Sequence, residues 1–263
     1  MDLGFTGKVT MVAASSKGLG FGIAQELARE GASVSIASRT QTDIENAAAK
    51  LRDETGASVL ATVMDATSAD SIQNWVQRTF AEFGGVDALV VNAGGPPPGQ
   101  FDDFSDNDWQ NAFELNVMSG VRMIRGVLPL MRKRGGGSIL TVTSSSVKEP
   151  IDILILSNVM RSGTTGLVKS LSLQLAPDNI RVNNLMPGRM DTDRVRSADA
   201  FQSQKQGITP EAQRANSQAS LPWKRYGTIE EFGKVGAFLL SDAASYITGS
   251  SVAVDGGMIR TVW

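Results

Sequence analysis

Two polar side chains stand four residues apart in the stretch LSNVMRSGTTGLVKS at 156–170, which is predicted to be helical. They are Ser157 and Arg161. A serine hydroxyl is far less acidic than a phenol, so it is a poor proton donor. A guanidinium stays protonated because its pKa lies above about 12, so Arg161 cannot relay protons. The pair could bind hydroxyl groups and stabilise an alkoxide, but it offers no ordinary general acid.

The chain offers few other groups for proton chemistry. It contains no histidine and no cysteine in 263 residues. This excludes disulfides, thiolate zinc sites, cysteine nucleophiles and Ser-His-Asp hydrolysis, and it removes the usual general base near neutral pH. Carboxylates, lysines, hydroxyls and two tyrosines, Tyr226 and Tyr246, remain. The acidic residues form no clustered motif, so no metal site is predicted.

A glycine-containing turn, AASSKGLG at 13–20, follows the first apolar run. Gly18 and Gly20 would let the backbone turn tightly and present helix N–H groups to a pyrophosphate, where the helix dipole favours anions. An ordinary glycine turn is the alternative, since the spaced G-x-G-x-x-G fingerprint is not met. The position of the turn after the first strand favours nucleotide binding.

The second apolar run ends in ASRT at 37–40, which places Arg39 where a ribose-reading acid could sit. An acid there would hydrogen-bond an unmodified ribose and repel a 2′-phosphate, whereas an arginine does the reverse. Lys17 could add a second positive charge, although it could equally be a solvated surface cation. Together these residues favour NADP (NADPH) over NAD.

Short apolar runs alternate with amphipathic stretches almost to the end of the chain. Strands are predicted over 8–14, 32–38, 58–64, 86–92, 138–144, 180–188 and 251–257, and helices over 18–31, 41–54, 68–83, 106–134, 154–176 and 229–240. This alternation predicts an α/β fold with a parallel sheet and helices on both faces. No linker or repeat divides the chain, so residues 1–263 are expected to form a single domain. Ligands of such sheets bind beyond the carboxyl ends of the strands.

The composition restricts the classes of partner. Apolar residues make up 41%, charged residues 20%, and the net charge is −2, as in ordinary soluble proteins. Without a basic excess no nucleic-acid partner is expected. No apolar run approaches 18 residues and the first residues lack a signal-peptide layout, so no membrane association is expected and the cytoplasm is the predicted location.

Several segments together resemble one family. The glycine turn, NAGG at 92–95, LAPDNIRVNNLMPGRMDTD at 175–193 and SDAASYITGSSVAVDGG at 241–257 resemble the short-chain dehydrogenases/reductases, of the type similar to 3-oxoacyl-carrier-protein reductases. The family's turn reads T-G-x-x-x-G-x-G, and Ala13 and Ala14 replace its Thr and first Gly. The likeness runs from about residue 5 to 257. It implies a doubly wound Rossmann-type domain, a seven-stranded sheet in the order 3-2-1-4-5-6-7 and a homotetramer through helices 106–134 and 154–176 and the C-terminal strand.

The resemblance also implies roles for individual residues. Asn116 corresponds to the family's active-site asparagine, Ser144 to its substrate-binding serine, and Asp65 to the acid that contacts adenine. The implied cofactor-binding residues are Ser15, Ser16, Lys17, Gly18, Leu19, Gly20, Arg39, Asp65, Ala66, Asn92, Ala93, Gly94, Arg161, Pro187, Gly188, Met190 and Thr192.

The sequence departs from the family at its catalytic pair. The family has a tyrosine thirteen residues after that serine and a lysine four residues later, and counting from Ser144 gives Ser157 and Arg161. The segment GLVKSLSLQLAP at 166–177 matches without a gap and fixes this register. Tyr226 and Tyr246 both fall in other matched segments. The Y-x-x-x-K motif is therefore read as S-x-x-x-R, with Asn116, Ser144, Ser157 and Arg161 as the catalytic candidates.

Three functions remain open. The chain could be an NADP(H)-dependent oxidoreductase acting on a carbonyl or alcohol, with a water at Ser157 or the side chain of Lys148 supplying the proton. Lys148 could equally be a solvated loop lysine. The chain could instead bind NADP(H) without turnover, as a sensor or partner subunit. It could also run a non-redox reaction, such as an elimination, on a substrate polarised by Arg161 and Ser144.

The substrate side is less specific. Three prolines stiffen the segment GGPPPGQFDDFSD at 94–106, which is expected to lie over the nicotinamide end. The polar residues around 190–220 correspond to the family's substrate lid. Arg194 and Arg196 could meet an anionic group such as a carboxylate or a phosphopantetheine thioester, or could be solvated. A small carbonyl compound or acyl thioester is the expected substrate.

Overall fold

The computed structural model describes residues 2–262. Its seven strands form one parallel sheet in the order β3-β2-β1-β4-β5-β6-β7, which confirms the expected order. The strands are β1 (Val9–Ala13), β2 (Ser33–Ser38), β3 (Val59–Val63), β4 (Ala88–Val91), β5 (Gly137–Val142), β6 (Ile180–Pro187) and β7 (Ser251–Val254). The order reverses between β1 and β4, where the chain leaves one half of the sheet and starts the other.

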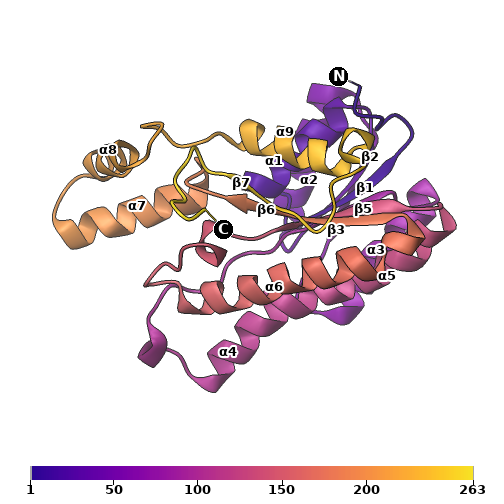
Figure 1. Ribbon diagram of the computed structural model, residues 1–263. Coiled ribbons are helices and arrows are strands. Elements are labelled where there is room, and N and C mark those ends of the chain that lie inside the picture. Colours follow the sequence, from indigo (N-terminus) through magenta and orange to yellow (C-terminus); the bar gives the residue numbers. More distant parts are fainter. Residues whose placement is uncertain (1, 263) are drawn as a thin grey trace.

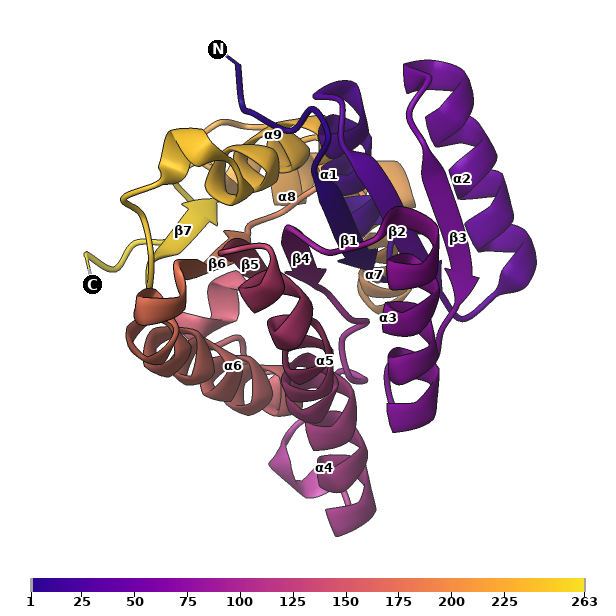
Figure 2. The same cartoon turned by 90° about the vertical axis from the view of Figure 1, so that its right-hand side faces the viewer.

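The central strands are apolar along their length because helices cover both faces of the sheet. Every residue of β1 and β4 is buried, as expected for strands inside a doubly wound sheet. Helices α1 (Gly18–Arg29), α2 (Gln41–Thr55) and α9 (Ile229–Leu240) pack on one face, and α3 (Ala69–Phe83), α5 (Ser119–Lys133) and α6 (Ile155–Gln174) pack on the other (Figures 1 and 2). The fold class predicted from the sequence is confirmed.

The segment expected to be one helix over 106–134 has an interruption. Helix α4 (Asp106–Phe113) leads into a π-helical turn, Glu114–Met118, before α5 continues to Lys133. Apolar periodicity does not reveal such a turn, because a single turn is too short to show a period of its own. Helix α6 contacts α4 and the π-helical turn, so the expected packing between the two long helical segments is confirmed at these parts.

The polar segment after β6 forms two helices, α7 (Asp193–Gln206) and α8 (Pro210–Ser220), which extend away from the sheet (Figure 1). Both begin at a threonine whose side chain caps the helix: Thr192 accepts from the N–H of Val195, and Thr209 accepts from the N–H of Ala212. Within residues 2–262, no helix combines the length and the apolarity needed to cross a bilayer.

Candidate nucleotide and active site

The turn after β1 is shaped around Gly20. A Cβ atom at Gly20 would lie 2.5 Å from the Ala14 carbonyl oxygen and 2.9 Å from Nδ2 of Asn92, so only glycine fits. Lys17 precedes α1 without capping it through its side chain. The first N–H groups of α1 therefore remain available, beside Ser16, Gly18 and Leu19, for an anionic phosphate group.

Ser15 has a structural position in this turn. Its hydroxyl donates to the Val12 carbonyl at 2.7 Å and accepts from the Ala37 N–H at 3.2 Å, which ties the turn to β2. Ser15 is fully buried. The backbone of Ala14 lies in the left-handed region with φ +48°, a conformation that is unfavourable for a residue with a Cβ atom.

The carboxyl ends of β2 and β3 place Arg39 near Asp65. Both side chains are exposed. The backbone N–H and hydroxyl of Thr67 donate to Asp65 at 2.9 and 2.8 Å. These bonds, and more weakly the charge of Arg39, lower the pKa of Asp65. Asp65 and Arg39 therefore offer a hydrogen-bond acceptor and a cation to a ligand. Ala66, the residue after Asp65, is half-buried.

The end of β4 is connected to the glycine turn by Asn92, whose Nδ2 donates to the Ala14 carbonyl at 3.2 Å. Ala93 and Gly94 follow at the edge of the site. No heavy atom lies within 4 Å of a Cβ placed on Gly94, so open space borders the backbone there.

The segment after β6 lies beside the glycine turn. Pro187 and Gly188 pass close to β7, since a Cβ on Gly188 would lie 2.6 Å from the Cα of Asp255. Met190 is buried. The Thr192 methyl group lies 3.7 Å from a Cβ placed on Gly18. The residue that caps α7 therefore packs against the glycine turn.

Asn116 occupies the π-helical turn and is 7% exposed. Its Nδ2 donates to the Ala112 carbonyl at 3.1 Å, and its own backbone carbonyl accepts from the Thr164 hydroxyl of α6 at 3.1 Å. Its Oδ1 is buried and has no hydrogen-bond partner among the described residues. A buried acceptor of this kind calls for a water molecule or a ligand donor, because leaving it unpaired costs roughly 1–3 kcal/mol.

Ser157 and Arg161 lie one turn apart on α6, and both are buried. Nη1 of Arg161 donates to the Val142 carbonyl, at the end of β5, at 2.9 Å. Burial, and then the like charge of Arg194, lowers the pKa of Arg161 to about 10. Arg161 therefore stays positively charged at neutral pH. Ser144 is half-buried beside the end of β5, where its hydroxyl accepts from the Ser146 N–H at 3.1 Å.

The two tyrosines have other surroundings. The Tyr226 hydroxyl donates to Oδ2 of Asp199 in α7 at 2.7 Å, and burial is the main reason why the pKa of Tyr226 is raised. Tyr246 is fully exposed shortly before β7.

Two contacts of this region were not anticipated from the sequence. The guanidinium of Arg194 lies against the backbone of Gly95, where it occupies the space that a Cβ would need. The ammonium of Lys17 lies 3.9 Å from a carboxylate oxygen of Asp193. Both contacts join segments about a hundred or more residues apart in the chain, and no local pattern encodes them.

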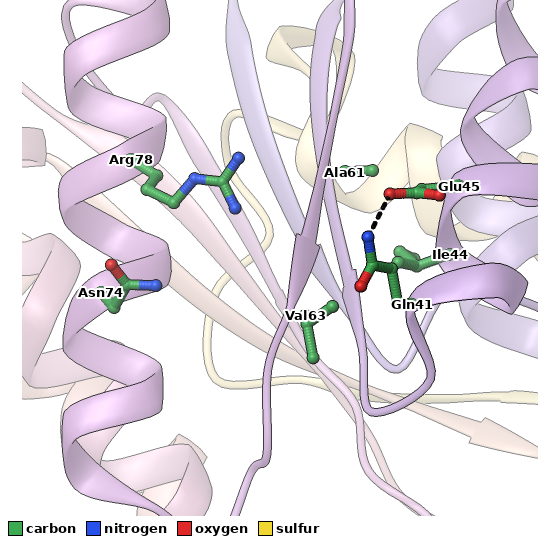
Figure 3. A pocket seen from close by; sticks show the side chains of 7 residues that line it. All are labelled: Gln41, Ile44, Glu45, Ala61, Val63, Asn74 and Arg78. Carbon is green, nitrogen blue, oxygen red and sulfur yellow. Dashed lines mark hydrogen bonds between the residues drawn. The ribbon is translucent and has the colours of Figure 1, made fainter.

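A separate pocket of about 370 Å³ opens beside β3, between α2 and α3 (Figure 3). It is lined by Gln41, Ile44, Glu45, Ala61, Val63, Asn74 and Arg78. Nε2 of Gln41 donates to Oε1 of Glu45 at 2.9 Å (Figure 3). This pocket lies at the outer edge of the sheet and contains none of the candidate site residues.

The parallel sheet, the glycine turn and the polar groups at the strand ends define a dinucleotide-binding α/β protein. A family model described as enoyl-(acyl carrier protein) reductase matches residues 13–259. Dehydrogenase/reductase SDR family member 4 of Bos taurus is 37% identical over 253 residues, which are 96% of this chain and 87% of that protein. The chain belongs to the short-chain dehydrogenase/reductase family and is an oxidoreductase that uses NAD(P)H on carbonyl or alcohol substrates.

Two solved structures are similar over nearly the whole chain. L-sorbose reductase from Gluconobacter frateurii, complexed with NADPH and L-sorbose, is 33% identical with a TM-score of 0.96 and covers 100% of both chains. An NADPH-bound short chain oxidoreductase from Pseudomonas aeruginosa PAO1, described as containing an atypical catalytic center, is 27% identical with a TM-score of 0.88. It covers 97% of this chain and 98% of its own.

Proposed function

We propose that the chain is an NADP(H)-dependent carbonyl reductase whose catalytic pair is Ser157 and Arg161. The observation that carries the proposal is the position of Arg161. Its guanidinium is buried and donates to the end of β5, one helical turn from buried Ser157. A charged group in this place can bind ribose hydroxyls and an alkoxide, because a guanidinium has five N–H donors.

The remaining residues complete this assignment. Ser144 and Ser157 would bind the substrate oxygen, and a water at the unpaired Oδ1 of Asn116 would supply the proton. Bound NADPH supplies the hydride. The segment α7–α8 would act as a lid, because its capping residue Thr192 packs on Gly18 and Arg194 lies against Gly95. A small carbonyl compound is the substrate class that fits these groups.

The proposed preference for NADPH rests on Arg39, which follows β2 and lies near Asp65, the residue expected to contact adenine. NADPH is bound in the similar structures from Gluconobacter frateurii and Pseudomonas aeruginosa. The free N–H groups at the start of α1 would bind the pyrophosphate, and the tight fit at Gly20 keeps the backbone close enough to do so.

Calorimetry with NADPH and NADH tests the cofactor choice. The native protein should bind NADPH more tightly, and Arg39→Asp should invert the preference, since a carboxylate repels the 2′-phosphate and accepts from a free ribose. Arg78→Asp, in α3, is the control for a charge reversal remote from the site and should leave the preference unchanged. Equal affinities of the native protein for both nucleotides would contradict the assignment.

Turnover is tested separately, by NADPH oxidation against 3-oxoacyl thioesters, diketones, quinones and keto sugars. Reduction of any of these supports the proposed reaction. Tight NADPH binding without turnover on the panel would favour the second candidate, a nucleotide-binding protein that does not act as a reductase. Arg161 supports this second candidate, because an arginine cannot replace a lysine that relays protons.

A further inference from the structure

Two arginines at the candidate site have no acidic partner among the residues that the structure describes. No carboxylate of residues 2–262 lies within 4.0 Å of the guanidinium of Arg161 or Arg194, and no acid contributes to the pKa of either group. Arg161 uses one N–H for the Val142 carbonyl. The guanidinium of Arg161 is therefore held at the end of β5 without a neutralising carboxylate beside it.

Neighbouring arginines show the opposite arrangement. Arg196, two residues after Arg194 on α7, pairs with Asp191 at 2.6 Å and with Asp193 at 2.7 Å. Arg214 of α8 forms a two-pronged pair with Asp191, at 3.1 and 2.7 Å. Acidic groups are therefore available in this region, and Arg194 is directed elsewhere.

Arg194 reaches the same strand ends as Arg161. Its guanidinium lies against Gly95, which follows β4, and Arg161 is bonded to the end of β5, the neighbour of β4 in the sheet. The two cations are close enough for the charge of Arg194 to lower the pKa of Arg161. Arg194 also lies in the first turn of α7, where the helix dipole disfavours a cation and favours an anion.

We propose that Arg161 and Arg194 together bind an anionic group of the substrate, most simply a carboxylate, so that the natural substrate is an oxo acid rather than a neutral ketone. The proposal rests on the reductase function proposed above. An anion between the two guanidiniums relieves their mutual repulsion in a partly desolvated site, and each guanidinium can bind a planar carboxylate through two N–H groups. Arg196 has no part in this site.

The test uses a matched series of 2-, 3- and 4-oxo acids and their methyl esters, which keep the carbonyl and remove the charge. Replacing a charged acceptor by a neutral one weakens a hydrogen bond by an amount that corresponds to roughly 10-fold in kcat/KM. The native protein should prefer at least one acid over its ester by this factor. Arg194→Gln should abolish the preference by lowering kcat/KM for the acid. Arg196→Gln removes one charge from the same helix and should keep the preference.

A binding measurement separates this proposal from the reductase assignment. Levulinate, a 4-oxo acid, is titrated by calorimetry into the NADP⁺-loaded native protein and both variants. Binding that Arg194→Gln abolishes, without turnover on any carbonyl, would support the anion site and overturn the reductase assignment. Equal turnover of acid and ester by the native protein would overturn the anion site and leave the reductase intact. Weaker NADPH binding by Arg194→Gln, with unchanged acid binding, would assign Arg194 to the phosphates of the cofactor and would also overturn the proposal.

Discussion

The guanidinium of Arg161 donates a hydrogen bond to the Val142 carbonyl at the end of β5, and it stays protonated. Burial lowers its pKa only to about 10, so at pH 7 it provides positive charge and hydrogen-bond donors without releasing a proton. A site that lacks a positioned general acid typically loses a factor of about 10²–10⁴ in rate. The proposed reductase should therefore be slow on ordinary ketones.

Restoring the tyrosine and lysine tests this view directly. The double change Ser157→Tyr with Arg161→Lys should raise carbonyl reduction about 10²-fold, because the phenol reaches further than serine and the lysine lowers its pKa. Each single change should gain much less, since the two groups act together. The measurement is NADPH oxidation by native, single and double variants. High native turnover that the double change abolishes would show that Ser157 and Arg161 are an efficient pair as they stand.

Gly20 gives a prediction about the nucleotide site. Gly20→Ala should lower the free energy of unfolding by about 1–3 kcal/mol and weaken NADPH binding, since the new methyl group would collide with the Ala14 carbonyl and the Asn92 amide. Gly163→Ala is the matched control, because a Cβ at that position in α6 has open space around it. It should be neutral or stabilising. Thermal unfolding with and without NADPH measures both effects, and equal behaviour of the two variants would rule the collision out.

The sequence locates the candidate residues better than it locates their contacts. The spacing from Ser144 assigns Ser157 and Arg161 to one helix, and the structure places both there, buried. The sequence left Arg194 and Arg196 equivalent. They differ because the rotation of α7 directs Arg194 to Gly95 and Arg196 to Asp191. Such choices depend on the three-dimensional position of the helix and have no local sequence signal.

At the level of elements, apolar periodicity predicts the seven strands and the helices that pack on them. It fails where burial does not determine the structure. Helices α7 and α8 lie in the polar stretch around 190–220, for which the apolar pattern predicts no helix, although Thr192 and the Thr209–Pro210 pair are helix-start signals. The π-helical turn at Asn116 is a single turn within a longer helical segment, and so short a turn has no periodic pattern that could predict it.

The ion pairs at Asp191 predict how α7 and α8 respond to acid. Hydrogen bonds from Arg214, and then from Arg196, lower the pKa of Asp191. A lowered folded-state pKa stabilises the folded form at pH values above the ordinary aspartate value of about 4, and this stabilisation is lost as the pH falls through the folded value. Protection of residues 193–220 from hydrogen exchange should therefore decrease as the pH falls below the ordinary aspartate value.

Asp191→Asn should remove this pH dependence and speed exchange in 193–220 about fivefold at neutral pH, since exposed ion pairs contribute roughly 0.2–1 kcal/mol each. Exchange in α1 serves as an internal reference. Asp193→Asn is the control variant, because the carboxylate of Asp193 pairs with exposed Arg196 and Lys17, and among residues 2–262 it forms no ion pair with α8. An unchanged acid response in Asp191→Asn would show that another group controls it.

At the scale of the whole molecule, apolar side chains are exposed on α6, one of the helices expected to form the subunit contact. Val159 and Leu173 on α6 are 47% and 70% exposed. We expect a tetramer, and Val159→Asp with Leu173→Asp should dissociate it by placing charges in the contact. Sedimentation at micromolar concentration measures the mass of both proteins. A native monomer would remove the oligomer prediction and leave the fold unaffected.

The two edges of the sheet have different capacities for self-association. Beside the free edge of β3, α2 and α3 carry polar and charged side chains, among them Gln41, Asn74 and Arg78 (Figure 3). Polar and charged groups near an edge strand discourage it from pairing with another chain. Strand β7, at the other end of the sheet, lies far from these groups. If a sheet can be extended at only one edge, two copies of the chain can pair through that edge and no further copy can add to it. Self-association should therefore give closed particles of fixed size and not fibres.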